Sequence, residues 1–375
     1  MAEATYDIVI LGGGIAGAAA AAFAARANRR TCLLTVGSRR ASRRWSCWLH
    51  PPAVPLLKAA GVDPESLADA AIHGVDFHSA DLQQSASCTD LEASAIVERS
   101  AVRAALLAVA ASIKSIDIRA SRTVTAIDSG ETQVHVTTED GSTVCGRLLI
   151  VADGHSSATA RRLGLTEPSM EGRRIAAAQI DAPDSSKAQQ PPGRDVIHLV
   201  LNAARPVALG LVLPTARGWT IGVVDEGDDD FVSRRLSKLC EQFRGAAGGF
   251  PRSMASARNI RCTTVPCGAA LDWETHVGKR ALVIGDAGGF VSALSVDGLY
   301  PSMLTAQLAV RVADEALNER HEQDALQQFD ALWRAELADY IRSPGTDLKF
   351  LIPMVFSNAA IAGRTARAFL TGENL

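Results

Sequence analysis

The sequence predicts an α/β (α+β) fold in which a domain with a parallel sheet is assembled from separated segments and a β-sheet domain is inserted between them. Three short apolar stretches carry this prediction: residues 6–11, 149–152 and 281–284, each followed by glycine or by aspartate and glycine. Short apolar runs that end in a turn are typical of strands buried on both faces, as in parallel sheets. Residues 176–225 keep a β-like pattern interrupted by proline and glycine, which favours the second, β-rich domain.

The first apolar stretch opens a strand–helix–strand unit. Tyr6–Leu11 is a predicted buried strand, the alanine-rich segment Ile15–Ala27 a helix, and residues 29–36 a second strand. The turn between the first strand and the helix reads Gly12-Gly13-Gly14-Ile15-Ala16-Gly17, which has the G-x-G-x-x-G spacing of dinucleotide-binding loops. Because a strand precedes and a helix follows, we predict a Rossmann-type domain. A glycine–alanine packing motif in an unrelated α/β fold is the alternative.

Each residue of this loop has a physical role in that interpretation. Gly12 permits the tight turn, Gly14 lets the backbone approach a pyrophosphate, and Gly17 lets the helix pack closely on the strand. The amides of Ile15 and Ala16 begin the helix, so their partial positive charge faces the phosphates. These five residues are therefore predicted to bind a cofactor.

Composition narrows the class of protein. The chain has 375 residues, a formal net charge of −3 and 47% hydrophobic residues, which fit a globular protein of two to three domains and give no general attraction to nucleic acid. Seven cysteines are scattered without a C-x-x-C pair, which favours reduced thiols in the cytoplasm. No Cys/His cluster has ligand spacing, so no metal site is predicted.

Residues 8–25 run almost without charge over about the length of a membrane span. Glu3 and Asp7 precede them, where a signal peptide would have basic residues. We therefore expect a buried strand–turn–helix in this segment.

The second and third apolar stretches each end in an aspartate. Leu149–Ala152 leads into Asp153-Gly154, and Ala281–Ile284 leads into Gly285-Asp286. An aspartate at such a strand end can accept hydrogen bonds from the sugar hydroxyls of a dinucleotide. The alternative for Asp286 is an N-cap of a short helix.

These three motifs in this order resemble the flavoprotein family that includes p-hydroxybenzoate hydroxylase-like monooxygenases and geranylgeranyl reductases. The resemblance covers the chain from Asp7 to about Leu317. It implies FAD as the resident cofactor, and NAD(P)H as an electron donor without a Rossmann domain of its own, which agrees with the single G-x-G-x-x-G motif.

The resemblance also implies roles for particular residues. Asp286 would contact the ribitol or pyrophosphate, with Asp153 and Gly285 also at the cofactor. Gly298 and Leu299 would lie at the flavin ring, where the positive end of the following helix stabilises charge on the reduced ring. Carried over in the same way, Arg99 matches the family arginine near the FAD backbone, and Val124 matches the strand residue beside the adenine.

Within the family, the details favour the geranylgeranyl reductase branch. Residues 285–293 and 297–300 are similar to that branch's G-D-A-x-G-F-V and E-G-I-Y segments. Cys47 falls where the branch has a cysteine over the flavin, so Cys47, Trp48 and His50 are the candidate catalytic residues. Flanking arginines could lower the pKa of the Cys47 thiol. A buried, inert cysteine is the alternative, and Trp48 would make the pocket beside the flavin narrower and more aromatic.

The chain departs from the family at the end of the second strand. An acidic residue normally binds the adenosine ribose there, whereas this sequence has Thr35 and Val36. Two alternatives follow: FAD is held more weakly, or Thr35, Ser38 and the basic segment 39–44 contact the adenosine side of the cofactor instead.

The predicted function is an FAD-dependent oxidoreductase that passes hydride from reduced flavin to an apolar or aromatic substrate. One alternative is a flavin monooxygenase that hydroxylates an aromatic compound or a side chain of a partner polypeptide. Another is an FAD-fold protein without catalysis. The C-terminal residues 348–370 could line a substrate entrance or touch a membrane, although core packing is the preferred interpretation. The expected organisation is an FAD-binding domain from residues 1–75, 95–170 and 275–335, a substrate domain from 76–94 and 171–274, and a helical segment from 336–375.

Overall fold

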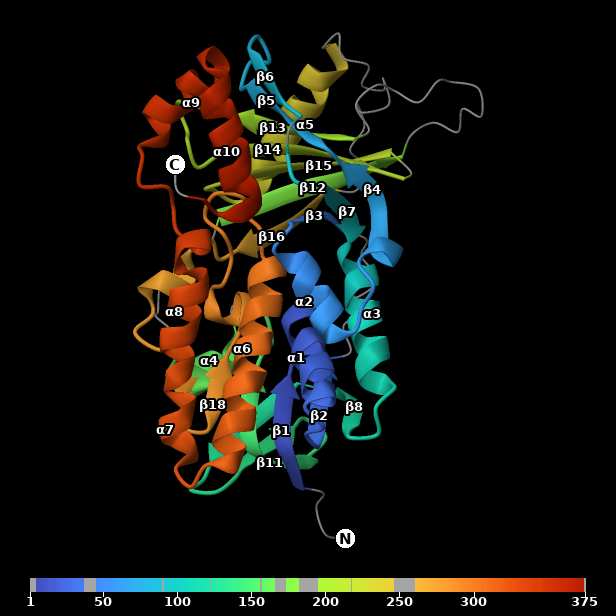
Figure 1. Ribbon diagram of the computed structural model, residues 1–375, viewed down its shortest axis with the longest axis vertical. Helices are drawn as coiled ribbons and strands as arrows, with labels where there is room; N and C mark the ends of the chain where they lie inside the picture. Colours follow the sequence, from blue (N-terminus) through green and yellow to red (C-terminus); the bar gives the residue numbers. More distant parts are fainter. Residues whose placement is uncertain are drawn as a thin grey trace.

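The computed structural model describes residues 5–36, 45–89, 91–121, 123–155, 157–165, 173–181, 195–216, 218–245 and 260–373. Three sheets, called A, B and C, and a set of helices make up these parts of the chain. Sheets A and C lie towards opposite ends of the molecule, with sheet B between them (Figure 1).

Sheet A contains the glycine-bordered strand expected from the sequence. Its parallel part has the order β18 (Ala281–Val283), β11 (Thr143–Val151), β1 (Thr5–Leu11), β2 (Thr31–Val36) and β8 (Ile116–Ser121). β17 (Val277–Gly278) pairs antiparallel with β18, and β10 (Val134–Thr138) pairs antiparallel with both β11 and β9 (Val124–Ser129). β1 lies between β11 and β2, so the turn after Leu11 stands at the middle of the carboxyl edge.

Helices cover one face of sheet A. They are α1 (Ile15–Arg26), α2 (Ala53–Ala60), α3 (Arg99–Ala111), α6 (Leu299–Asn318), α7 (Glu322–Leu326) and α8 (Gln328–Ile341). Ile8 and Ile10 of β1 belong to the core beneath these helices, whereas Val9 and Leu11 belong to a second core with Val134 of β10. This alternation is the period of two that a strand buried on both faces requires.

Sheet C is mostly antiparallel and takes strands from two distant segments. Its order is β16 (Arg261–Val265), β12 (Arg173–Asp181), β15 (Gly218–Asp225), β14 (Leu209–Thr215), β13 (Val196–Leu201), β5 (Gly74–Ser79) and β6 (Ser85–Cys88). The pair β13–β5 is parallel. Helix α5 (Asp229–Gly245) packs on one face of the sheet, and α9 (Leu348–Ser357) and α10 (Ala359–Thr371) pack on the other (Figure 1).

Sheet B is a small antiparallel sheet in the order β3 (Ser46–Leu49), β7 (Ser94–Glu98) and β4 (Ala68–Ile72). Short helices complete the described elements: α4 (Ala158–Arg162) and the 3-10 helices Glu65–Leu67, Ala269–Asp272 and Gly285–Gly288.

Most predicted elements agree with the structure, and the mixed α/β fold with a Rossmann-type part is confirmed. The alanine-rich segment Ala68–Ile72 forms strand β4 and pairs with β7. Strand pairing there overrides the helical preference of alanine. The expected domain limits stay a prediction.

Residues 8–25 form β1, the glycine turn and α1, and their apolar side chains are buried. Across the ranges that the structure covers, no helix combines the length and apolar character needed to cross a bilayer.

Candidate FAD site

The glycine loop is shaped by close backbone contacts. Gly12 has a φ of +109°, and a Cβ atom there would lie 2.2 Å from the carbonyl oxygen of Ala152. A Cβ atom on Gly17 would lie 1.8 Å from the carbonyl oxygen of Gly12. Gly14 differs from both, because a Cβ atom there would meet nothing within 4 Å. The loop is thus tightly packed on its protein side and open on its outer side, where a phosphate would approach.

A second layer of side chains surrounds Gly13. A Cβ atom at Gly13 would lie 2.6 Å from Thr35 Cγ2, and the carbonyl oxygen of Gly13 accepts a hydrogen bond from Arg103 Nε. Thr35 therefore lies beside the loop, near the carboxyl end of β2. Arg103 places a cation at the same point, where it would complement a pyrophosphate.

A cavity of about 630 Å³ extends from this loop across the carboxyl edge of sheet A. Gly14 and Ile15 line it at the loop, and Asp286 and Gly298 line it further along. The opposite wall comes from sheet C, through Ile175 of β12 and Thr263, Thr264 and Val265 of β16. The volume lies within the usual range for cofactor sites.

Asp286 contributes a buried carboxylate with spare hydrogen-bonding capacity. It lies in the 3-10 helix Gly285–Gly288, whose N-cap is Ile284, so the N-cap alternative for Asp286 is wrong. Its Oδ1 atom is buried and has no hydrogen-bond partner among the described residues. Burial raises the pKa of Asp286, although Arg99 and His155 oppose the rise. A buried acceptor without a donor fits a hydroxyl group of a bound dinucleotide.

Arg99 is the cation that faces this carboxylate. It is the first residue of α3, and its amide donates a 2.9 Å hydrogen bond to the carbonyl oxygen of Trp45. Burial opposes the charged guanidinium, but Cys47, Asp286 and Asp297 outweigh burial and raise the pKa of Arg99. Arg99 thus stays cationic inside the cavity.

The amino end of α6 is held by a chain of buried hydrogen bonds. Asp297 accepts bonds from the amides of Leu299 at 2.8 Å and Tyr300 at 3.2 Å. Tyr340 donates its hydroxyl to Asp297 at 2.9 Å, and His50 Nδ1 lies 2.6 Å from the same hydroxyl. Burial lowers the pKa of His50 despite the nearby Asp297, so His50 is neutral at pH 7.

This chain changes the roles expected of two residues. The Leu299 amide is already bonded to Asp297 and its side chain is fully buried, so Gly298, which lines the cavity, is the residue of this pair that a flavin ring could contact. His50 supports the amino end of α6 through Tyr340 and does not line the cavity.

Cys47 and Trp48 lie in β3. Burial raises the pKa of Cys47 to about 12, and Arg99 opposes this only in part, whereas the flanking arginines lie outside the described residues, so the catalytic role of Cys47 stays a prediction. Trp48 packs in the core of sheet C and donates its indole Nε1–H to Ser94 Oγ at 2.8 Å. Trp45, not Trp48, lines the cavity.

Two further expected cofactor residues, Asp153 and Val124, do not line the cavity. Asp153 Oδ2 accepts a 3.3 Å hydrogen bond from the Thr159 amide, and its Oδ1 atom is buried without a described partner. Val124 begins β9, and its carbonyl oxygen accepts a bond from Arg162. Ser38 and the basic residues 39–44 lie outside the described residues.

Several residues of the cavity were not predicted from the sequence. Arg103 follows Arg99 by one helical turn, so helical spacing could have identified it. Trp45 is two residues before Cys47 on the same segment. The residues of β16 carry no sequence signal, because only strand order brings them to the cavity.

The FAD binding domain family matches residues 5–326 of this chain. The chain belongs to this p-hydroxybenzoate hydroxylase-like family and is an FAD-dependent oxidoreductase, as the motifs indicated. The open glycine loop, the orphaned Asp286 oxygen and the cationic Arg99 fit an FAD cofactor.

Solved structures share the fold over nearly the whole chain. A geranylgeranyl bacteriochlorophyll reductase-like protein from Thermoplasma acidophilum is 17% identical, with a TM-score of 0.71 over 98% of this chain and 97% of that one. PqsL of P. aeruginosa, in complex with 2-aminobenzoylacetate, is 15% identical, with a TM-score of 0.69 over 97% and 100%. The p-nitrophenol 4-monooxygenase PnpA of Pseudomonas putida is 17% identical, with a TM-score of 0.67 over 97% and 93%. No curated protein matches the sequence.

Proposed function

We propose that this protein is a flavin-dependent reductase that transfers hydride to an apolar substrate, with NAD(P)H as the electron donor. The observation that carries the proposal is an apolar pocket next to the FAD cavity. We also infer a cytoplasmic location, which the scattered cysteines of the sequence favour.

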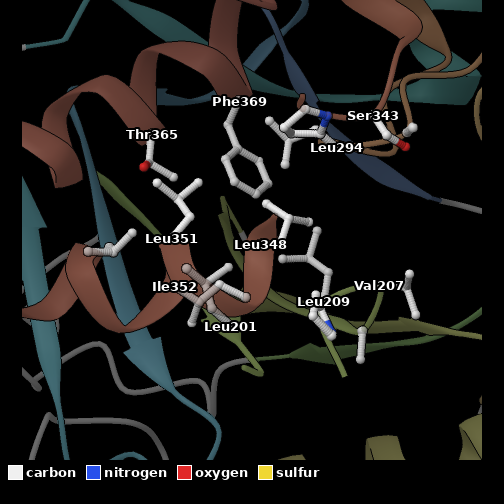
Figure 2. A pocket seen from close by; sticks show the side chains of 15 residues that line it. Leu201, Val207, Leu209, Leu294, Ser343, Leu348, Leu351, Ile352, Thr365 and Phe369 are labelled. Atoms are coloured by element: carbon white, nitrogen blue, oxygen red, sulfur yellow. The ribbon is translucent and has the colours of Figure 1, made fainter. Parts of the chain in front are cut away.

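The apolar pocket has a volume of about 60 Å³ and lies between sheet C and the two C-terminal helices (Figure 2). Leu201 and Leu209 line it from β13 and β14, and Leu351 and Phe369 line it from α9 and α10. None of the described residues around it is charged. A pocket without a cation favours an apolar group over an anionic aromatic acid, which would need a paired charge.

One loop separates this pocket from the FAD cavity. Val291 and Val296 line the FAD cavity, whereas Ala293 and Leu294 line the apolar pocket. The Ala293 amide donates a 3.0 Å hydrogen bond to the carbonyl oxygen of Ile341, which fixes the loop against α8. The apolar pocket would therefore hold only an apolar group of the substrate, while the double bond that is reduced must lie in the FAD cavity near Gly298, because hydride transfer needs direct contact with the flavin.

Thr365 supplies the one buried hydroxyl of the pocket lining. Its Oγ1 atom is buried and has no hydrogen-bond partner within the described parts of the chain, although it stands among apolar side chains. Such a hydroxyl can bind a polar group of a substrate that is otherwise apolar. Ser343, the other polar residue of the lining, is exposed and can pass a proton from water.

Bound FAD would supply the redox chemistry, by taking hydride from NAD(P)H and delivering it to the substrate. The protein's part would be to hold the cofactor through Gly14, Arg99 and Asp286 and to bind an apolar group of the substrate in the adjacent pocket, so that the double bond lies against the flavin. Reduction of a carbon–carbon double bond then needs one hydride from the flavin and one proton, which enters from solvent because the described lining contains no acid.

An anaerobic reaction tests this proposal. The purified protein is loaded with FAD, reduced by light without oxygen and mixed with unsaturated apolar compounds such as prenyl alcohols. We expect the oxidised flavin spectrum to return and a saturated product to form. A flavin monooxygenase, the activity named for PnpA, would give no anaerobic product and would instead consume NAD(P)H and oxygen to form a hydroxylated product, from a small aromatic compound or a peptide side chain. A protein that shows no flavin bands after FAD is added would be a non-catalytic fold member.

A further inference from the structure

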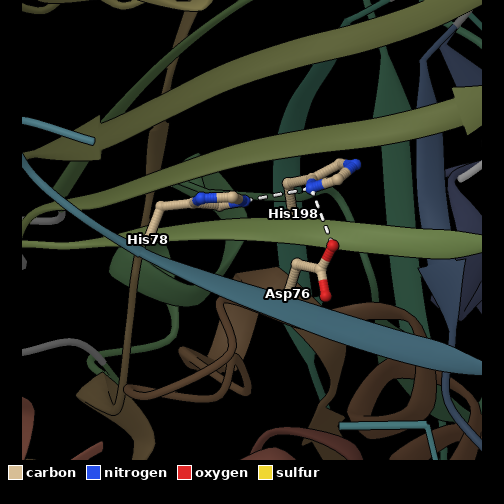
Figure 3. Close-up of side chains that lie close together, drawn as sticks. All are labelled: Asp76, His78 and His198. Atoms are coloured by element: carbon tan, nitrogen blue, oxygen red, sulfur yellow. Dashed lines mark hydrogen bonds and ion pairs between the residues drawn. The ribbon is translucent and has the colours of Figure 1, made fainter. Parts of the chain in front are cut away.

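Three potential metal ligands converge on one face of sheet C, away from the FAD cavity. Asp76 and His78 alternate along β5, and His198 lies directly opposite Asp76 in the parallel register of β13. Residues two apart in a strand point to the same face, so all three side chains project together, as Figure 3 shows. This is the face of sheet C that α5 covers, and the ring of Phe243 from α5 lies 5.8 Å from the ring of His78.

The distances between the ligand atoms suit a small divalent ion. His78 Nε2 lies 3.1 Å from His198 Nδ1, and His198 Nδ1 lies 3.6 Å from Asp76 Oδ2. The three ligand atoms lie within 4.8 Å of one another. Tetrahedral zinc, with metal–ligand bonds of about 2.0–2.1 Å, places its ligand atoms about 3.3 Å apart. Shifts of a fraction of an ångström would therefore bring all three atoms to bonding distance.

The chemistry of the three side chains also suits a metal ligand set. A neutral imidazole carries one N–H and one lone pair. At most one proton serves the contact between the two rings, while the Asp76 carboxylate adds a negative charge on the other side of His198 Nδ1.

We propose that Asp76, His78 and His198 bind a divalent transition-metal ion, Zn²⁺, and that a water molecule occupies the remaining coordination position. Two histidines and one carboxylate with an open position are a known donor set for such ions. The spacing rules applied to the sequence miss this site, because His198 is 120 residues from His78. The site stands independently of the proposed reductase activity.

A bound ion would connect the two segments that build sheet C. It would join β5 to β13 across the parallel strand pair of that sheet. Phe77 lies between Asp76 and His78 and points to the opposite face, where its ring is 6.1 Å from the ring of Phe369. Phe369 lines the apolar pocket. The metal would therefore fix the strand that stands directly behind one wall of that pocket.

Metal titration of the full-length FAD-loaded protein, without an affinity tag and after treatment with EDTA, tests the proposal. We expect calorimetry with Zn²⁺ to show one ion per chain. We also expect Zn²⁺ to raise the melting temperature by a few degrees, because it binds only the folded state. Co²⁺ should give the visible absorption of a low-coordinate nitrogen and oxygen site and should be displaced by Zn²⁺.

Three variants identify the ligands. His78→Gln, His198→Gln and Asp76→Asn should each weaken Zn²⁺ binding at least tenfold, whereas His73→Gln, which changes an exposed histidine just before β5, should bind like the wild type. FAD absorbance and circular dichroism check that each variant is folded. If buried His198→Gln does not fold, the two more exposed ligands carry the test. The proposal is overturned if the wild type binds no stoichiometric Zn²⁺, or if folded His78→Gln and Asp76→Asn bind it as tightly as the wild type.

Discussion

The FAD cavity and the apolar pocket share the loop 291–297 as a wall, but their linings differ. The cavity, at about 630 Å³, is lined by backbone glycines, Arg99, Arg103 and Asp286. The pocket, at about 60 Å³, has no charged side chain in its described lining. Each nevertheless contains one buried oxygen without a described partner, Asp286 Oδ1 or Thr365 Oγ1. The contrast teaches that the two linings suit different ligands: the cavity offers charges and backbone amides for a dinucleotide, whereas the pocket suits an apolar group.

The largest effects on stability and FAD binding are expected from alanine substitutions on the packed and the open side of the glycine loop. In Gly17→Ala the new Cβ atom meets the Gly12 carbonyl oxygen, so we expect the apoprotein to lose about 1–3 kcal/mol of unfolding free energy and FAD binding to be lost. In Gly14→Ala the Cβ atom faces open space and the backbone φ of −73° suits alanine. Stability should therefore be unchanged, while FAD affinity falls more than tenfold.

Urea unfolding of the apoprotein and fluorescence titration with FAD measure the two quantities. Wild-type FAD affinity in Gly14→Ala would show that the pyrophosphate does not lie on this loop.

Asp286→Asn should separate stability from cofactor binding. Because burial raises the pKa of Asp286, the charged carboxylate destabilises the folded apoprotein, and this cost appears as the pH rises through the raised pKa. The variant should thus be more stable than the wild type at pH 7 and equally stable below the usual carboxyl range. FAD affinity should fall about tenfold, as expected for losing one charge-assisted hydrogen bond. Chemical unfolding at several pH values measures the gain in stability, and FAD titration measures the loss of affinity. Equal stability of the variant and the wild type at pH 7 would contradict the prediction.

Thr365→Val tests whether the buried hydroxyl of the apolar pocket lacks a partner and binds substrate, and its effects on stability and KM should be smaller. Replacing a buried, unpartnered hydroxyl by a methyl group should stabilise the protein by about 1 kcal/mol. The KM for a substrate with a polar group should rise several-fold, while the FAD spectrum stays unchanged. Thermal unfolding and steady-state kinetics provide the measurement, with Thr371→Val on the exposed end of α10 as the matched control. A destabilised Thr365→Val would mean that the hydroxyl has a partner in the folded protein.

The smallest effect is expected at Cys47. With a pKa of about 12, the thiol is protonated at neutral pH and cannot act as a nucleophile or base. Cys47→Ser should keep activity within about twofold of the wild type, and iodoacetamide at pH 8 should leave Cys47 unmodified in the folded protein. Peptide mass spectrometry and kinetics follow both; a loss of activity above tenfold would restore a catalytic role for the thiol.

The sequence predicted the elements that depend on contacts between residues close together in the chain. The strand–glycine–helix unit follows from the sequence because Gly12 and Gly17 permit contacts that no side chain allows. The role of Cys47 could not be predicted, since the pKa of its thiol depends on burial beneath distant elements. The metal-ligand cluster and the β16 wall of the cavity depend on strand order across sheet C, which no spacing along the chain contains.

The strand order of sheets A and C affects folding during synthesis, because each sheet combines segments that are far apart in the sequence. Sheet A is completed only when β18 at residues 281–283 joins β11, and sheet C receives β5 from residues 74–79 but β16 from residues 261–265. Neither sheet can close until most of the polypeptide has left the ribosome. Such long-range pairing slows folding and leaves unpaired strand edges exposed during synthesis. We therefore expect fragments that end before β18 to be less stable than the full-length chain, because sheet A would lack that strand.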